Sequence, residues 1–328
     1  MHRTALAALA VAAAGLVVAP GGASLYVYIP DVLVIRTPAE ADAWLTDAEI
    51  SLGVQPSSDP IYATHPELKR LDRTAKIMTK HWAQLDGACD GNAVFALLYL
   101  TMTWSVREHV LQGYFDDNDY LATITTVFAS LYLDAWNHWK AGDVAHVQKG
   151  WQEAFRAGSG LHTSVLQDEF LGINAHVNYD LGVAIATLGT TDANGHSRKP
   201  DMDRINHVLA DDSDDAAYYL ALYDGPTPPS PPTYSKTHTS RAGDTATWLT
   251  IEPIAGWREG SWANALAIEG LPTPEARAAH DAAMQDYAWS VAQGFQTPNS
   301  PDPAPARLAY CQANPPSLWT GPTVEHPL

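Results

Sequence analysis

One apolar segment of the chain carries four polar side chains whose types and spacing suit chemistry: Asn174, His176, Asn178 and Asp180. At about 100° per residue in an α-helix, His176 and Asp180 lie one turn apart on one face, and the two asparagines pair on another. A carboxylate and an imidazole at this spacing can chelate a divalent metal ion, or the carboxylate can orient the imidazole as a general base. Because an ionised carboxylate is costly to bury without a partner, something must compensate the charge of Asp180.

A second apolar segment places Asp134 and His138 four residues apart. One interpretation is an exposed pair that contributes roughly a few tenths of a kcal/mol to its helix. The other is that Asp134 faces the first pair, so that His176, Asp180, Asp134 and His138 supply the ligands of a divalent metal ion such as zinc. For His176 and Asp180 too, a purely structural pair that fixes the register of its helix is an alternative to a functional site.

The helices that must position these residues are signalled along most of the chain. Thr37-Pro38-Ala39-Glu40 is a capping box with proline at the first helical position, and Asp116 or Asp117 can cap a later helix. Elsewhere apolar residues recur at three- and four-residue steps or form long apolar runs. We predict helices over residues 37–52, 65–82, 92–110, 117–139, 144–155 (ended by glycines at 158 and 160), 161–188, 203–209, 216–223, 245–268 and 274–295.

These segments predict an all-α fold, a single multi-helix domain with long apolar helices over residues 24–296. The proline-rich stretch 226–232 is expected to form a polyproline-type loop, and the proline-rich C-terminal tail 297–328 to extend over the surface. Only residues 25–35 have a pattern that suits an edge strand. One domain is favoured over two because the part of the chain after the proline-rich loop is short for a domain.

Composition narrows the classes of function. The 328 residues include 37 Asp and Glu against 19 Lys and Arg, for a formal net charge of −18. Nucleic-acid backbones and anionic membrane surfaces both bind basic patches, so we expect neither as a partner. The sequence contains no phosphate-binding loop, dinucleotide-binding glycine motif, nucleophile elbow or His-Glu-x-x-His motif. A small-molecule or ester substrate is the partner that remains.

The first 23 residues have the pattern of an export signal. A basic start at Arg3 precedes an apolar run over residues 5–19, and small residues follow as far as Ala23. The run is about 15 residues long, shorter than the roughly 20 that span a membrane. We therefore predict cleavage near Ala23, a secreted protein and no stable membrane anchor. An uncleaved anchor or an ordinary N-terminal helix is the alternative.

The chain has two cysteines, Cys89 and Cys311. In an oxidising compartment such a pair can form a disulfide, and a bridge that closes so long a loop is worth roughly 4–5 kcal/mol in chain-entropy models. Two unpaired thiols are the alternative, because a sequence carries no information on the distance between two Cβ atoms.

Several segments resemble successive blocks of an actinobacterial family that is catalogued only as domain of unknown function 5995. The family hallmark, Asn-Ala-His-(Ile/Val)-Asn-x-Asp-Leu, is matched by residues 174–181, and the segments 94–103, 127–135 and Arg204-Ile205-Asn206 are similar to other blocks. The resemblance covers roughly residues 65–270. It implies a helical fold and no general activity. Members often carry Asn-Arg before Leu-Tyr-Leu, where this chain has Ala96-Leu97, so a site that used that arginine would be altered here.

The function that we favour from the sequence is that of a secreted α-helical enzyme, a hydrolase of an ester or phosphoester with metal assistance. His176 is then a metal ligand or general base, Asp180 its fellow ligand or orienting group, and Asn174 or Asn178 a polar contact to substrate. Two alternatives stay open. One is a non-catalytic secreted binding protein in which these residues form a structural polar core. The other is a metal-free biosynthetic cyclase or isomerase that uses His176 as a proton shuttle in a cavity lined by Trp and Tyr.

Overall fold

The computed structural model describes residues 37–56, 58–160, 163–211, 245–296, 309 and 311–313. Within these ranges the protein is helical and has no strand, and a single isolated bridge joins Thr191 to Ser197. The prediction of an all-α fold is confirmed. Several predicted features lie outside the described residues, namely the export signal, the edge strand at 25–35, the helix at 216–223, the loop at 226–232 and most of the tail from 297.

The α-helices are α1 (Pro38–Leu52), α2 (Pro66–Gly87), α3 (Ala93–Leu111), α4 (Asn118–Lys140), α5 (Lys149–Gly160), α6 (Val165–Ala175), α7 (Gly182–Leu188), α8 (Lys199–Asp211), α10 (Thr245–Gly270) and α11 (Pro274–Phe295). Two short 3-10 turns accompany them, η1 (Pro60–Ala63) and η2 (Val144–His146). Between α6 and α7 the chain forms a π-helical segment, η3 (His176–Leu181). None of the described helices combines the length and the hydropathy that crossing a bilayer would need.

Two of the predicted helix starts are confirmed by their caps. The side chain of Thr37 accepts a hydrogen bond from the backbone N–H of Glu40, and α1 begins at Pro38. The side chain of Asp117 accepts from the backbone N–H of Tyr120 at the start of α4. Each cap satisfies a backbone donor that the first helical turn leaves without a partner.

Four predicted helices differ from the observed ones. Helix α2 continues beyond residue 82 to Gly87, and α8 spans Lys199–Asp211 where 203–209 is predicted. The other two differ in how they begin, end or divide. The segment 144–155 begins with the turn η2, and α5 then runs through Gly158 to Gly160 instead of ending before these glycines. Gly158 is needed for packing, because a Cβ atom there would lie 2.6 Å from Oδ1 of Asn92. The predicted single helix over 161–188 is divided into α6, η3 and α7.

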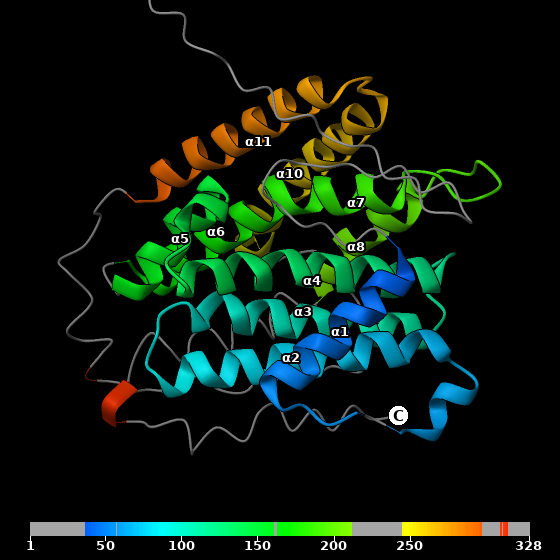
Figure 1. Ribbon diagram of the computed structural model, residues 1–328, viewed down its shortest axis with the longest axis horizontal. Helices are drawn as coiled ribbons and strands as arrows, with labels where there is room; N and C mark the ends of the chain where they lie inside the picture. Colours follow the sequence, from blue (N-terminus) through cyan, green and yellow to red (C-terminus); the bar gives the residue numbers. More distant parts are fainter. Residues whose placement is uncertain are drawn as a thin grey trace, which may run out of the picture.

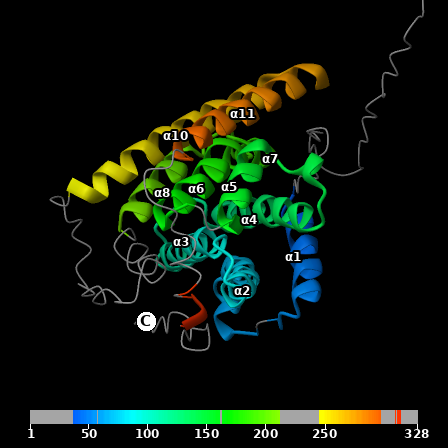
Figure 2. The same ribbon diagram turned by 90° about the vertical axis from the view of Figure 1, so that its left-hand side faces the viewer.

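The helices stack in layers that enclose η3. Helices α2 and α3 pack against each other and against α4, with α1 on the outer side of α2 and α4 (Figure 1). On the other side of α4 lie α5, α6 and α7, and α10 and α11 run side by side across them (Figure 2). The segment η3 contacts α4, α6, α7, α10 and α11, so it lies in the middle of the stack.

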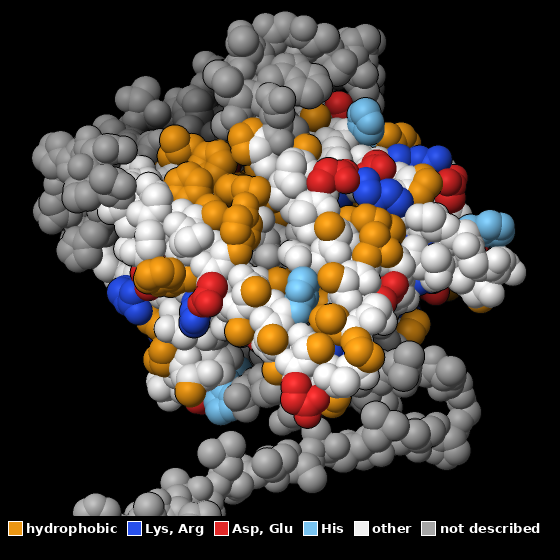
Figure 3. Space-filling view, turned by 90° about the horizontal axis from the view of Figure 1, so that it is seen from above, with side chains coloured by type: hydrophobic (Ala, Val, Ile, Leu, Met, Phe, Trp, Pro, Cys, Tyr) orange, Lys and Arg blue, Asp and Glu red, His pale blue; other side chains and the backbone are white. Residues whose placement is uncertain are grey.

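The face formed by α10 and α11 shows apolar side chains among charged ones (Figure 3). Among the side chains of these two helices that the structure describes, the large exposed apolar ones are Leu266, Tyr287 and Trp289. Beneath the surface, the core is rich in large aromatic side chains. The largest that are fully buried are Trp151, Tyr132, Tyr179 and Phe155.

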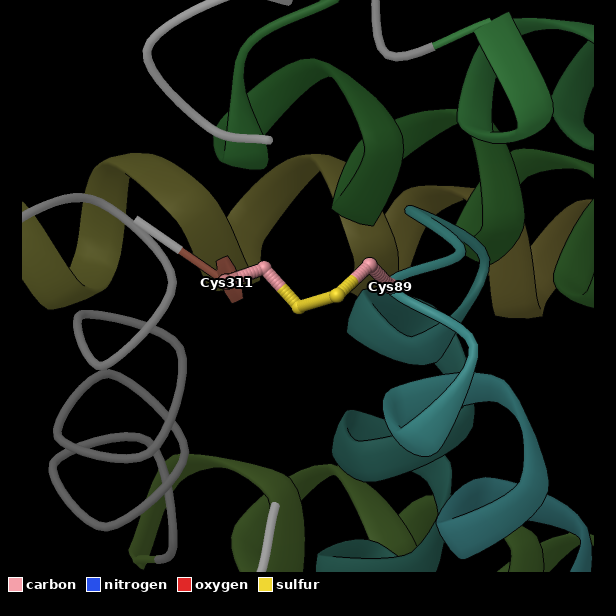
Figure 4. The surroundings of a disulfide bond; sticks show 2 residues. All are labelled: Cys89 and Cys311. Carbon is pink, nitrogen blue, oxygen red and sulfur yellow. A yellow bond between two sulfur atoms is a disulfide. The ribbon is translucent and has the colours of Figure 1, made fainter. Parts of the chain in front are cut away.

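Cys89 and Cys311 form a disulfide, with Cα atoms 5.9 Å apart (Figure 4). Of the two alternatives left open by the sequence, the structure has the bridge. Cys89 adopts a left-handed backbone conformation (φ 54°) in the turn between α2 and α3, and its N–H donates to the carbonyl of Asp86. The bridge therefore attaches the short described segment near residue 311 to the turn between α2 and α3.

Candidate functional site

His176 and Asp180 form a hydrogen-bonded pair in the interior of the protein. Nδ1 of His176 lies 2.9 Å from Oδ2 of Asp180, and Nε1 of Trp151 donates to the same oxygen at 2.8 Å. His176 is 3% exposed and Asp180 is fully buried. Trp151 thus fixes the carboxylate and the carboxylate fixes the imidazole, which is the way a carboxylate orients a catalytic histidine.

Two polar atoms of this pair have no hydrogen-bond partner in the described part of the chain, Nε2 of His176 and Oδ1 of Asp180. An unpaired buried polar atom costs roughly 1–3 kcal/mol, so such atoms are uncommon in native proteins. The imidazole is therefore held through one ring nitrogen and open at the other. A group that accepts or delivers a proton needs this combination.

Aromatic rings surround His176. The ring of Phe128 is stacked on the imidazole with centroids 3.3 Å apart, and the ring of Tyr99 meets it edge-on at 4.5 Å. Other rings, at centroid distances of 5.5 to 6.3 Å, belong to Phe95, Trp151 and Tyr132. These aromatic side chains come from α3, α4 and α5, which makes the surroundings of the pair strongly apolar.

The π-helical segment that carries the pair is stabilised by α10. Oγ of Ser261 lies 2.5 Å from the carbonyl oxygen of Val177 and within hydrogen-bond distance of the Trp257 carbonyl. Helix α10 can approach closely because residue 182 is glycine, where a Cβ atom would lie 3.2 Å from the carbonyl oxygen of Ser261. Single π-helical turns occur often at functional sites, so this local geometry adds weight to the pair as a site.

Burial governs the protonation of the pair. It raises the pKa of Asp180 well above its usual value, against the opposing effect of the hydrogen bond from Trp151, and it lowers the pKa of His176 well below its usual value. Apolar surroundings therefore favour the form of the pair that has no net charge. Without a proton on Nε2, and with one proton shared between Nδ1 and Oδ2, the pair carries a charge of −1. Proton uptake at Nε2 neutralises it, so the pair as a unit is a base.

A small pocket shares a wall with the pair. Its lining includes Phe95, Tyr132 and Trp151, whose rings also contact His176. The interior space has room for about one water molecule. Two polar side chains, Asn92 and Asp168, contribute to the lining, and no Lys or Arg does.

The predicted site residues Asn174 and Asn178 are used elsewhere. Nδ2 of Asn178 donates to Oδ1 of Asn174, and Nδ2 of Asn174 donates to the carbonyl of Ala288 in α11, each at 2.8 Å. The hydroxyl of Tyr179 donates to Asp281, which also belongs to α11. The two asparagines therefore connect α6 and η3 to α11, and their described hydrogen bonds do not involve His176 or Asp180.

Asp134 and His138 are not brought to the pair. Nε1 of Trp44 donates to Oδ1 of Asp134 at 3.2 Å, and His138 pairs with Asp143. On α4 the residues that contact His176 are Phe128 and Tyr132; at about 100° per residue, Asp134 and His138 lie on a different face. The four residues predicted as ligands of a metal ion thus lie in two separate places. Burial raises the pKa of Asp134 to about 6.

Several residues of the site are absent from the sequence-based prediction. Trp151, Phe128 and Tyr99 reach His176 from three other helices, and no local spacing in the sequence relates them to it. A tryptophan in the first turns of an amphipathic helix is ordinarily interpreted as core. Only the packing of α5 against the rest of the bundle shows that its indole N–H is a partner of Asp180.

A model of a family described as "Family of unknown function (DUF5995)" matches residues 71–298. The chain belongs to this family. The DUF5995 match begins within α2, includes α3 to α11, and so contains the whole His176–Asp180 site. It includes Cys89 but not Cys311, so the disulfide joins the DUF5995 region to a residue outside it. No curated protein and no solved structure matches the chain.

Proposed function

We propose that the protein is a hydrolase of carboxylic esters in which His176 and Asp180 act as the acid–base pair. The observation that carries the proposal is the state of Nε2 of His176, which is buried and unpaired while the same ring is oriented through Nδ1. Trp151 supports the orientation from behind Asp180. A base that is held in place by a second group, itself held by a third, is the arrangement common to many hydrolases.

The pocket next to the pair favours an ester over a phosphoester. Stabilising the charge on a transferring phosphoryl group calls for Arg, Lys or a metal ion, and neither Arg nor Lys lines this pocket. Its aromatic wall, formed by Phe95, Tyr132 and Trp151, has the apolar character that suits an acyl or alcohol group, and these side chains must move apart to admit one because the pocket has room for about one water molecule. We therefore place carboxylic esters with an apolar substituent first among the substrates.

Hydrolysis would proceed by general-base catalysis. The step starts from the form of the pair whose Nε2 carries no proton. Nε2 of His176 then takes a proton from a water molecule as the water oxygen bonds to the ester carbonyl carbon, which neutralises the buried pair. The same proton passes to the leaving alkoxide as its bond to that carbon breaks, so the products are one acid and one alcohol. A metal-assisted version would need ligands besides Nε2 and Oδ1, and Asp134 and His138 are held elsewhere. Entry of substrate requires the aromatic side chains around His176 to move, because that residue is only 3% exposed.

The test is an assay of the purified full chain with p-nitrophenyl acetate, butyrate and phosphate. We expect turnover of the carboxylic esters and little of the phosphate. His176→Gln should lower kcat/KM by about 10²–10⁴-fold, the usual contribution of a general base. The matched control is Tyr179→Phe, which removes a buried hydrogen bond from the same segment on the side of α11. A loss of equal size in the control, or no ester turnover by the wild-type chain, would refute the proposal.

The enclosure of the pair favours a second candidate, a binding protein in which His176 and Asp180 are a structural polar core. If this candidate is correct, the wild-type chain turns over none of the esters. His176→Gln should then lose much stability, and Tyr179→Phe should lose only a little. A metal-free isomerase that uses the same proton site would also show no ester turnover, but it would tolerate His176→Gln with its fold intact. Thermal unfolding of the two variants therefore separates these alternatives.

We also propose that the protein acts outside the cell. The export signal expected from the first 23 residues supports this location, and so does the disulfide, since such bridges persist in oxidising compartments. N-terminal sequencing of protein recovered from the culture medium of the native host should begin near Ser24. Soluble intracellular protein that retains Met1 would contradict the proposal.

A further inference from the structure

A second group of potential ligands lies at the surface, at the end of α4. Nδ1 of His138 lies 3.0 Å from Oδ2 of Asp143, and Nδ1 of His146 lies 2.7 Å from the same oxygen. One ligand atom from each residue lies within 4.8 Å of the others. Among the described residues, no other three His, Cys, Asp or Glu side chains come together in this way.

The end of α4 explains why Asp143 lies beside His138. The N–H of Gly142 donates to the carbonyl of Trp139, and the N–H of Asp143 donates to the carbonyl of His138. This pair of bonds is a Schellman motif, which needs a left-handed residue after the helix, and Gly142 fills that position with φ 76°. The motif turns the chain back, so that the side chain following the glycine meets one from the last turn of the helix.

The turn η2 then supplies the third side chain. The N–H of His146 donates to the carbonyl of Asp143 at 3.1 Å, and the N–H of Val147 donates to the carbonyl of Val144. In a 3-10 turn, residues three apart lie on the same side. His146 is therefore placed over Asp143, and its ring centroid is 5.3 Å from that of His138.

We propose that His138, Asp143 and His146 bind a divalent transition-metal ion such as Zn²⁺. Two imidazole nitrogens and one carboxylate oxygen are the donor set of many three-ligand zinc sites, which keep a further position for water or substrate. Imidazole ligands favour Zn²⁺, Co²⁺, Ni²⁺ and Cu²⁺ over Mg²⁺ and Ca²⁺, which prefer oxygen. The metal ion would replace the protons that Asp143 now shares with the two imidazoles.

This metal site is separate from the His176–Asp180 pair. His138 follows Phe128, the residue stacked on His176, by ten positions in α4, a rise of about 15 Å along the helix. The three side chains are 39–44% exposed, so an ion bound between them would keep a face open to solvent. The proposed metal site and the proposed esterase activity can therefore be tested independently of each other.

A matched control for this cluster exists on the same molecule. His196 and Asp192 form an exposed His–carboxylate pair at 3.1 Å, and no third ligand completes it among the described residues. If an exposed pair alone were enough to hold the ion, His196→Ala would weaken binding as much as a change in the cluster. If three ligands are required, only the cluster variants should matter.

The experiment is a metal titration of the full chain, purified without a histidine tag and stripped with EDTA. Titration with Co²⁺ should produce visible d–d absorption that saturates at one equivalent, and Zn²⁺ should abolish it by competition. His146→Ala and Asp143→Asn should each weaken Co²⁺ and Zn²⁺ binding by more than about 100-fold, because loss of even an outer-sphere partner costs 10–100-fold. His196→Ala should bind as the wild type does.

Circular dichroism and thermal unfolding of each variant show whether it is folded, and the exposure of all three side chains makes folded variants the expected result. Saturable binding that survives in both His146→Ala and Asp143→Asn would overturn the proposal. So would an equal loss in His196→Ala, or the absence of Co²⁺ absorption at millimolar metal. The esterase assay of the His146→Ala protein is an independent measurement, and its outcome does not affect the metal site.

Discussion

The imidazole of His176 lies parallel to the ring of Phe128, with planes inclined by 6° and centroids 3.3 Å apart. A face-to-face contact this close leaves no space for a water molecule or an ion above that face of the imidazole. The polar atoms of His176 are then reachable only in the plane of the ring, and Nδ1 is already paired with Asp180. Any chemistry of His176 has to pass through Nε2.

The first prediction concerns the stability of the pair. His176→Phe leaves Asp180 buried with Trp151 as its remaining donor, and breaking a buried pair in this way should lower the free energy of unfolding by about 3 kcal/mol or more. The double variant His176→Phe/Asp180→Leu removes both polar groups at similar volume. We expect it to recover that loss, because well-packed apolar replacements of buried pairs are often neutral or stabilising by about 1–4 kcal/mol.

Urea unfolding of the wild type, both single variants and the double variant gives the coupling energy between the two positions. If the double variant is as unstable as the worse single variant, the two residues are not coupled in the way that the geometry indicates.

The second prediction concerns Gly172 in α6. A Cβ atom there would lie 2.3 Å from Cδ2 of Phe95, which is part of the wall between the pocket and His176. Gly172→Ala should therefore displace Phe95 and lower the free energy of unfolding by about 1–3 kcal/mol. Gly260→Ala in α10 is the control, because nothing lies within 4 Å of its added atom. That variant should gain up to about 1 kcal/mol from helix propensity. If denaturant unfolding shows that Gly260→Ala is the less stable of the two variants, the packing of Phe95 against Gly172 does not limit stability as we expect.

The third prediction is a pH dependence of stability. Burial raises the pKa of Asp134 to about 6 from 3.8. The folded protein therefore holds a proton on this carboxyl that the unfolded chain has lost, and stability falls as pH rises from about 4 to about 6. Asp134→Asn can still accept the hydrogen bond from Trp44 and has no charge to bury. At pH 7.5 it should raise the melting temperature, and it should raise the free energy of unfolding by at most about 3 kcal/mol. At pH 4 it should change both quantities little. Equal shifts in melting temperature at both pH values would show that the buried charge of Asp134 is not the cause.

The fourth prediction concerns the disulfide. Cys89 and Cys311 are separated by 222 positions, and chain-entropy models give a bridge over such a loop about 4–5 kcal/mol of stability. The double variant Cys89→Ser/Cys311→Ser should lose that amount in chemical unfolding. Reduced wild-type protein should behave like the double variant, since both lack the same constraint. Two thiols that titrate freely in denatured, unreduced wild-type protein would show that the bridge is absent.

Much of the fold is predictable from local signals in the sequence. Thr37 and Asp117 are helix caps whose partners lie within three residues, so both helix starts follow from short motifs. The prediction of a hydrogen-bonded pair at His176 and Asp180 also rests on local spacing, and the two side chains do face each other. The π-helical geometry between them has no signature in the residues themselves. This segment contacts α10, and one of these contacts is the hydrogen bond from the Ser261 hydroxyl to the Val177 carbonyl.

What local spacing could not supply is the side of a helix that faces the site. The four-residue separation of Asp134 and His138 places them together, but it does not tell whether their common face meets η3 or α1. The structure turns Asp134 toward Trp44 and His138 toward Asp143. The sequence prediction includes His138 of the surface cluster as a metal ligand but not Asp143 or His146, because their placement beside it depends on the reversal of the chain at Gly142. A His-x4-Asp-x2-His pattern with glycine before the aspartate is the signal that could have revealed it.

The bridge between Cys89 and Cys311 also makes most of the chain a covalent ring. A protease that cuts the backbone once, anywhere between these two residues, opens the ring but leaves both pieces attached through sulfur. The nicked protein would migrate as one species on a non-reducing gel and as two after reduction. The helices on either side of such a cut would stay at high effective concentration and could reassemble as an intramolecular event. If the protein acts outside the cell, as we propose, a single cleavage by an extracellular protease would leave the two pieces joined.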